Sequence, residues 1–114
     1  IKGRDIFDAM NVAARKGGEA ISGNVRAVVD EDERLIRLVV DGEELDPEKT
    51  YYVGTIDYVA EGNDDMVTLA NHDKIWEDDL EVSVPILRWF IRQQELGLPI
   101  SPSQDRRFVR SVSK

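Results

Sequence analysis

The sequence contains no cysteine and only one histidine, His72. Without cysteine there are no thiolate metal ligands, thiol nucleophiles or disulfides in this stretch of chain. A metal site needs three or four convergent ligands. The acidic residues near His72 can be combined with it on paper, but their spacing matches no metal signature: Asp64, Asp65 and Asp73. No serine stands in a Gly-x-Ser-x-Gly elbow either. We therefore expect no self-sufficient active site, and we interpret His72 as a surface or capping residue.

Positive charge and long apolar runs are also scarce. The chain has 15 Lys and Arg against 23 Asp and Glu, a formal net charge of -8. Its arginines form no single basic stripe, which disfavours binding to nucleic-acid backbones and a strong phosphate site built by this chain alone. No apolar run approaches a membrane span, and no signal peptide is visible. Because the chain opens without Met in what reads as helix material, we expect a fragment or a processed product.

The first half of the sequence predicts a helix followed by strands. Residues 4–16 have the apolar spacing of an amphipathic helix, which Gly17-Gly18 ends. Residues 20–29 and 34–40 are rich in Val, Ile and Leu and predict two strands joined by an acidic turn. Asp41-Gly42 is a strong two-residue hairpin signal and predicts a short strand at 43–45. After a turn at Asp46-Pro47, the run "TYYVGTI" at 50–56 predicts a further strand.

The second half predicts one clear helix and a last strand. Ser83 is predicted to cap the helix, with Pro85 in its first turn, and Gly97 ends it. "RRFVRSV" at 106–112 alternates like a terminal strand at a sheet edge. Helices near both ends around several strands indicate an α+β domain. The 114 residues, of which 41% are hydrophobic, suit a single domain spanning 1–114.

The stretch "DYVAEGNDDM" at 57–66 raises the question of a ligand site. The ring of Tyr58 offers a face on which a nucleobase can stack, worth on the order of 1–3 kcal/mol. The carboxylate of Asp64 can accept hydrogen bonds from the vicinal hydroxyls of a ribose, and Gly62 permits close backbone approach. Alternatively, Tyr58 packs in the core, Gly62-Asn63 forms a turn, and Asp64 caps the next segment. The residues alone favour this second interpretation and leave the first open.

A longer run around this stretch resembles a known family. Residues 40–66, "VDGEELDPEKTYYVGTIDYVAEGNDDM", resemble the hallmark region of the 5'-nucleotidase C-terminal domain. Upstream, "IKGRDIFDAM" and "ISGNVRAVVD" resemble its helix and its Ser-Gly strand, so the likeness covers most of residues 1–70. The positions that match the hallmark pattern are Gly42, Leu45, Asp46, Pro47, Tyr51, Val53, Thr55, Asp57, Tyr58, Gly62 and Asp64.

The resemblance implies a fold and a set of roles. In such enzymes a metallophosphoesterase domain holds two divalent metal ions and a catalytic Asp-His pair. The C-terminal domain, with layers arranged α/β/β/α, stacks the base between two aromatic rings and binds the ribose through the Asp of a Gly-Gly-Asp loop. By resemblance, Tyr58 is one stacking ring and Asp64 the ribose-binding carboxylate, while Gly62 and Asn63 shape the loop. The resemblance implies no catalytic residue and no metal ligand in this chain.

The loop also departs from the family pattern. Asn63 replaces its second glycine, Asp65 replaces the glycine after Asp64, and Met66 replaces the following aromatic residue. We expect these changes to make positive φ angles harder to adopt. The family's other stacking aromatic residue, its substrate-binding arginines and its metal ligands belong to segments upstream of those matched here.

The sequence therefore predicts the substrate-recognition part of a 5'-nucleotidase-like phosphohydrolase, periplasmic, secreted or at the cell surface. Its expected partners are a nucleoside or nucleotide and a metallophosphoesterase domain in the same or a neighbouring chain. The two metal ions belong to that domain, so this chain alone is not expected to be catalytic. The alternative is a non-catalytic binding module that kept the fold and lost nucleotide binding. An exposed sheet edge also suggests self-association.

Overall fold

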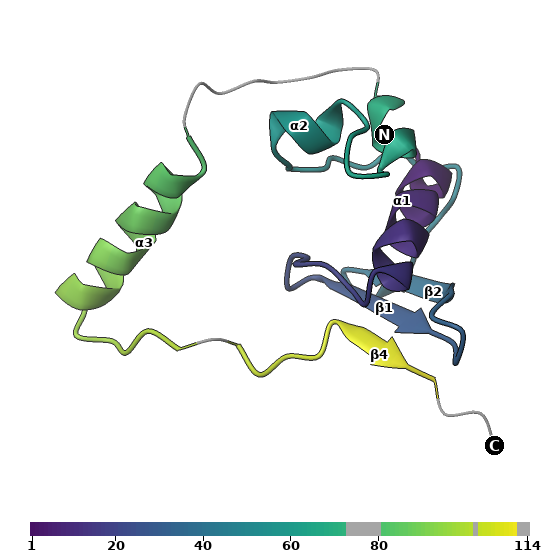
Figure 1. Ribbon diagram of the computed structural model, residues 1–114. Coiled ribbons are helices and arrows are strands. Elements are labelled where there is room, and N and C mark those ends of the chain that lie inside the picture. The colour runs from purple at the N-terminus through teal and green to yellow at the C-terminus, as the bar shows by residue number, and fades with distance from the viewer. Residues whose placement is uncertain (73–80, 102, 112–114) are drawn as a thin grey trace. The chain divides into compact units, whose positions relative to one another are not determined.

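The structure, a computed structural model, describes residues 1–72, 81–101 and 103–111 (Figure 1). The chain divides into two compact units, which are described separately: unit 1 comprises residues 1–73 and 105–114, and unit 2 residues 74–104. The combination of helices with a mixed sheet confirms the predicted α+β class. In chain order the elements are α1 (Gly3–Arg15), β1 (Val25–Val29), β2 (Leu35–Val40), β3 (Glu43–Glu44), α2 (Asp57–Ala60), the 3-10 helix η1 (Val67–Ala70), α3 (Ser83–Glu95) and β4 (Phe108–Arg110).

Unit 1 contains a four-stranded sheet in the order β3-β2-β1-β4. Strand β2 pairs antiparallel with both β1 and β3. Strand β4 pairs parallel with β1 at the edge of the sheet, where the sequence predicted a terminal strand. Asp41 and Gly42 have φ angles of 53° and 80°. A type I′ hairpin requires positive φ at both positions, so the predicted two-residue turn is confirmed. The first strand begins at Val25 rather than at residue 20, because Gly23 and Asn24 form a turn.

Helix α1 covers one face of this sheet and closes the core. Its apolar stripe packs on inward-facing side chains of β1 and β2, among which Ala27 and Leu38 are 0% and 2% exposed. The buried cluster consists of Ala14, Ala27, Val29, Leu35 and Leu38, with Ile6, Phe7, Met10, Val25, Leu45 and Phe108 packed against it. The described residues form one sheet covered by α1, and the second sheet of the expected α/β/β/α arrangement is not found among them.

The segment 50–56 is not a strand, and that prediction was wrong. Its backbone pairs with the residues just before α1: the amide of Tyr51 donates to the carbonyl of Ile1 at 2.7 Å, and Lys2 and Thr50 form an isolated bridge. Because α1 begins at Gly3, this ladder is too short to count as a strand. Periodicity in a sequence reports which residues suit a strand, but a strand also needs a pairing partner.

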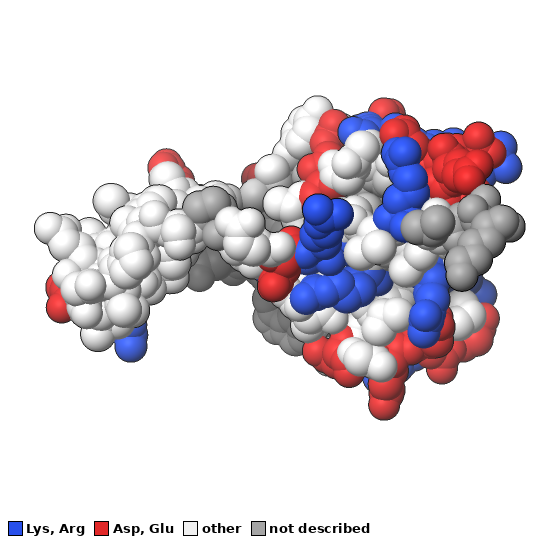
Figure 2. All heavy atoms as spheres, turned by 90° about the horizontal axis from the view of Figure 1, so that it is seen from below, with Lys and Arg blue, Asp and Glu red and all other residues white. Residues whose placement is uncertain are grey.

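The other face of the sheet carries arginine and valine side chains. Successive residues of a strand point to opposite faces, so Arg26 and Val28 of β1 and Arg37 and Val39 of β2 face away from α1. Lys and Arg stand among uncharged groups on this side (Figure 2). Arginines far apart in sequence thus come together, but each has a carboxylate beside it. The ion pairs are Arg26–Asp105 (3.8 Å), Arg107–Asp105 (3.9 Å), Arg110–Glu33 (3.7 Å) and Arg37–Glu44.

Unit 2 is built on helix α3. Ser83 is its first helical residue and makes no side-chain capping bond, so the predicted cap was wrong. The cap position is Val82, whose φ of -56° and ψ of -33° are already helical. Pro85 lies in the first turn, as predicted. At the other end Gly97 has a φ of 67°, and the amide of Leu98 donates to the carbonyl of Gln93 at 2.9 Å, which closes the helix. None of the α3 side chains is buried.

No helix in the described ranges is both long enough and apolar enough to cross a membrane.

Candidate functional site

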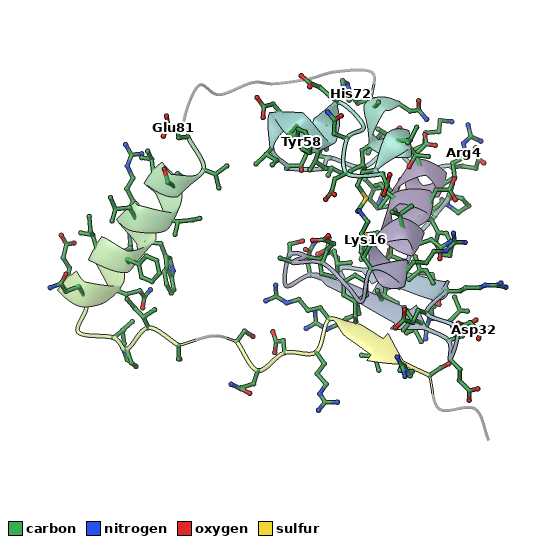
Figure 3. The ribbon with its side chains drawn as sticks, viewed as in Figure 1. Arg4, Lys16, Asp32, Tyr58, His72 and Glu81 are labelled. Carbon is green, nitrogen blue, oxygen red and sulfur yellow. The ribbon has the colours of Figure 1, made fainter. Side chains whose placement is uncertain are left out.

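Tyr58 lies on α2, a single helical turn that follows the extended segment 50–56 (Figure 3). The turn is closed by hydrogen bonds from the amides of Ala60 and Glu61 to the carbonyls of Ile56 and Asp57, both at 3.0 Å. The Tyr58 residue is 56% exposed. The interpretation that places this ring in the core is therefore wrong, and the ring is accessible to a ligand.

The next residues hold the loop in a defined shape. Gly62 has a φ of 90°, and its amide donates to the carbonyl of Val59 at 3.0 Å. A Cβ added at Gly62 would lie 3.3 Å from the Cβ of Ala70 and 3.4 Å from the carbonyl oxygen of Val67. Gly62 is therefore required both by its backbone conformation and by its close approach to η1.

Asn63 ties this loop to the residue that carries the ring. Its Nδ2 donates to the carbonyl oxygen of Tyr58 at 2.9 Å, so the amide satisfies a carbonyl of the short α2 turn. That Asn63 shapes the loop was predicted only from the family resemblance. The hydrogen bond to Tyr58 shows how a side chain at this position does so, which a glycine cannot.

Asp64 and Asp65 both adopt left-handed backbone conformations, with φ angles of 59° and 62°. Asp65 thus adopts a positive φ although it stands where the family pattern has a glycine. Aspartate is one of the few residues other than glycine that enter this region, because its short side chain bonds locally. Met66 is 8% exposed and packs on Ala9 and Ala13, so the end of the loop is anchored to α1.

Lys16, the residue that follows α1, contacts both aspartates, a feature that no sequence motif indicated. Its Nζ donates to the carbonyl oxygen of Asp64 at 2.8 Å and to Oδ1 of Asp64 at 3.2 Å, and lies 3.6 Å from Oδ2 of Asp65. The hydrogen bond to the Asp64 side chain is the main cause that raises the pKa of Lys16 above its usual value. Lys16 is also the C-cap of α1, where the helix dipole favours a cation.

The structure places Tyr58, Gly62, Asn63 and Asp64 on one short stretch between the start of α2 and η1. The Asp64 side chain is 53% exposed, so its carboxylate is accessible although it pairs with Lys16. Of the residues considered as metal ligands, His72 is half-buried beyond η1, and Asp73 lies outside the described residues. Across the described part of the chain, no three His, Asp or Glu side chains are grouped so as to hold a metal ion.

Comparison with known proteins connects this geometry to a family. A family model described as the 5'-nucleotidase, C-terminal domain, matches residues 1–71. The matched range contains α1, the strands β1 to β3 and the whole stretch from α2 to η1, whereas α3 and β4 lie outside it. Searches of curated proteins and of solved structures found no match.

Proposed function

Because the chain belongs to the 5'-nucleotidase C-terminal domain family, we propose that it is the substrate-recognition part of a 5'-nucleotidase-like phosphohydrolase. The observation that carries this proposal is the accessibility of two chemically different groups on one short, shaped stretch. Tyr58 offers an exposed aromatic face, and Asp64 offers an exposed carboxylate. These are the two positions to which the family resemblance assigns base stacking and ribose binding.

The two groups suit the two halves of a nucleoside. An aromatic ring stacks on a nucleobase with little dependence on the base, at about 1–3 kcal/mol per base. A carboxylate accepts hydrogen bonds from sugar hydroxyls, which gives orientation as well as affinity. Positioning of this kind lowers the entropic cost of a reaction whose chemistry takes place elsewhere on the ligand. This chain therefore contributes binding and orientation.

The hydrolytic step itself would belong to a metallophosphoesterase domain in the same protein or in a neighbouring chain. Two divalent metal ions there would activate a water molecule and polarise the phosphate ester. The substrate would be a nucleoside monophosphate or a nucleotide sugar, which present a base and free ribose hydroxyls, or a 2',3'-cyclic nucleotide, which presents the base but has both vicinal oxygens esterified. Location in the periplasm, outside the cell or at the cell surface is part of the same proposal.

A second candidate is a binding module that kept this fold and lost nucleotide recognition. The observation that favours it is the contact of Lys16 with Asp64, because a ligand hydroxyl must share that carboxylate with an ammonium group. The replacement of family glycines by Asn63 and Asp65 points the same way.

An NMR titration of the chain with adenosine, with AMP and ribose as comparisons, separates the two candidates. We expect adenosine to shift the amide signals of Tyr58 and residues 62–66, and ribose alone to shift them less because it cannot stack. Tyr58→Ala is expected to weaken binding by about tenfold or more, the equivalent of one lost stacking contact, whereas Tyr58→Phe retains it.

Tyr52→Ala is the matched control, since Tyr52 is 85% exposed and precedes the α2 turn. It removes an exposed tyrosine without touching the proposed site, so adenosine binding should be unchanged. Wild-type signals that stay fixed at millimolar adenosine would argue for the module that lost its ligand.

A further inference from the structure

The loop that carries the proposed ribose-binding carboxylate has an unfavourable backbone conformation. Asp64 and Asp65 are consecutive and both left-handed, which places each Cβ close to a backbone oxygen. Single residues other than glycine visit this region, but two in succession are uncommon. Their two carboxylates also carry like charge next to each other. Interactions from outside the loop are therefore needed to hold this conformation.

Lys16 supplies such interactions from a separate element. Its ammonium donates to the backbone oxygen of Asp64 as well as to the side chain, so it fixes the peptide and the carboxylate together. It also lies within ion-pairing distance of Asp65, which offsets the repulsion between the two carboxylates. The contact spans 48 residues of sequence. The side chain starts at the C-cap of α1, where the amide of Lys16 is bound to the carbonyl of Ala13 at 3.1 Å.

The contacts of Asp64 leave one of its oxygens for a ligand. Oδ1 is bound to Lys16, whereas Oδ2 has no hydrogen bond to any described residue. The side chain is half exposed, so the second oxygen can be reached from solvent. A carboxylate anchored through one oxygen presents the other in a fixed direction, which reduces the ordering cost of binding a hydroxyl.

We propose that Lys16 is a positioning residue of the ligand site, which holds Asp64 and Asp65 in their left-handed conformation and orients the Asp64 carboxylate toward a ligand hydroxyl. The ligand part of this inference rests on the proposed function, whereas the effect on the loop can be tested without ligand. Met66 anchors the loop to α1 independently, through its packing on Ala9 and Ala13. Loss of the Lys16 ammonium should therefore change the local geometry and leave the fold intact.

The test compares three variants of the whole chain. Lys16→Met keeps the aliphatic stem and removes the ammonium, and Lys16→Arg restores a cationic donor. Arg15→Met is the matched control, because Arg15 is in the last turn of α1 and has no ion pair or hydrogen bond to the described residues. Each variant is examined by NMR, first without ligand through the amide shifts and HN–Hα couplings of Asp64 and Asp65, then by adenosine titration.

We expect Lys16→Met to change the shifts and couplings of both aspartates while signals of the sheet stay in place. Adenosine binding should weaken roughly tenfold, because the Asp64 carboxylate must then be ordered when the ligand binds, and Lys16→Arg should recover most of the affinity. Arg15→Met should leave the loop and the affinity unchanged. A purely structural lysine would lower stability without altering the loop signals.

Three other results are informative. If the loop signals of Lys16→Met match those of the wild type, the inference is overturned, whatever the ligand does. If the loop rearranges but adenosine affinity is unchanged, the role in orienting a ligand is overturned. If the loop rearranges and the wild-type chain does not bind adenosine, the loop-holding role of Lys16 is supported and the proposed function fails.

Discussion

At the scale of single residues, the contact between Lys16 and Asp64 makes a prediction about pH. The hydrogen bond raises the pKa of Lys16 above the ordinary lysine value of 10.5. A raised folded-state pKa means that the contact stabilises the fold fully below the unfolded-state pKa, and that this contribution is lost as pH rises through the folded-state value. The contribution of Lys16 to stability is therefore lost only as pH rises above the ordinary lysine pKa of 10.5. At neutral pH Lys16 stays charged and the contribution is complete.

Asp64→Asn tests this prediction, because the amide keeps the shape and removes the charge. We expect the pKa of Lys16, followed through its side-chain NMR signals between neutral and strongly alkaline pH, to fall toward the ordinary value. The carbonyl of Asn at this position can still accept from Nζ, so some of the shift can persist. An unchanged Lys16 pKa in Asp64→Asn would mean that the two side chains do not meet in solution.

At the scale of elements, the start of α1 depends on a close backbone contact. A Cβ added at Gly3 would lie 2.1 Å from the carbonyl oxygen of Asp46 and 3.1 Å from the Cα of Pro47. These are backbone atoms, so they cannot move aside as a flexible side chain would. The amide of Gly3 also donates to the carbonyl of Lys49 at 2.9 Å. The first turn of α1 and the turn after β3 are therefore packed directly against each other.

We predict that Gly3→Ala lowers the free energy of unfolding by about 1–3 kcal/mol, since overpacking forces the two segments apart. Urea denaturation monitored by circular dichroism measures this loss. Gly54→Ala is the control, because an added Cβ there meets nothing within 4 Å and its φ is not in the left-handed region. It should leave stability unchanged or raise it slightly. Equal effects of the two substitutions would contradict the close contact.

The elements that could be predicted from sequence are those determined by local signals. The turn at Asp41-Gly42 depends only on the φ angles of these two residues and on two flanking strands. Helix α1 depends only on its stripe of apolar residues and on the glycines that follow it. Segment 50–56 has strand-like residues, but its state depends on whether a partner strand runs beside it. The cap of α3 depends on the backbone of Val82, which a serine at position 83 does not reveal.

The residues of the candidate site also divide into those that local sequence signals identify and those that depend on a distant part of the chain. Tyr58, Gly62, Asn63 and Asp64 follow one another in sequence, so a motif could identify them together. Lys16 contacts Asp64 in space, but it is the C-cap of α1 and has no fixed spacing in sequence to the loop. The left-handed conformation of Asp64 and Asp65 could not be predicted for the same reason. The residue type alone disfavours it, and the cation that stabilises it is 48 residues from Asp64 in sequence.

At the scale of the whole molecule, unit 1 is completed by residues from both ends of the chain. The strand β4 pairs with β1 after the chain has passed through unit 2. The remaining sheet edge, β3, consists of two glutamates, and short charged edges resist pairing with another chain. Self-association stays a prediction that no observation here tests.

Phe108 of β4 connects the two parts of the unit 1 core. It packs against the cluster under α1 that contains Leu38, and also against the cluster that contains Met66. Its ring lies against the backbone of Gly18, where an added Cβ would be 3.4 Å from the ring. One side chain from the C-terminal strand therefore contributes to the packing of the sheet and of the cluster that includes Met66, the residue after Asp65.

We predict that Phe108→Ala destabilises the chain by about 2–4 kcal/mol, less than for a fully buried phenylalanine because the ring is half-buried. Val109→Ala is the neighbouring control, since Val109 is 41% exposed and should cost less than about 1 kcal/mol. Denaturant unfolding gives both values. Because Phe108 reaches the Met66 cluster, the amide signals of residues 62–66 should also shift in Phe108→Ala and stay fixed in Val109→Ala. A loss of stability without any shift in that loop would show that the two clusters pack independently, and that the C-terminal strand supports the sheet but not the candidate site.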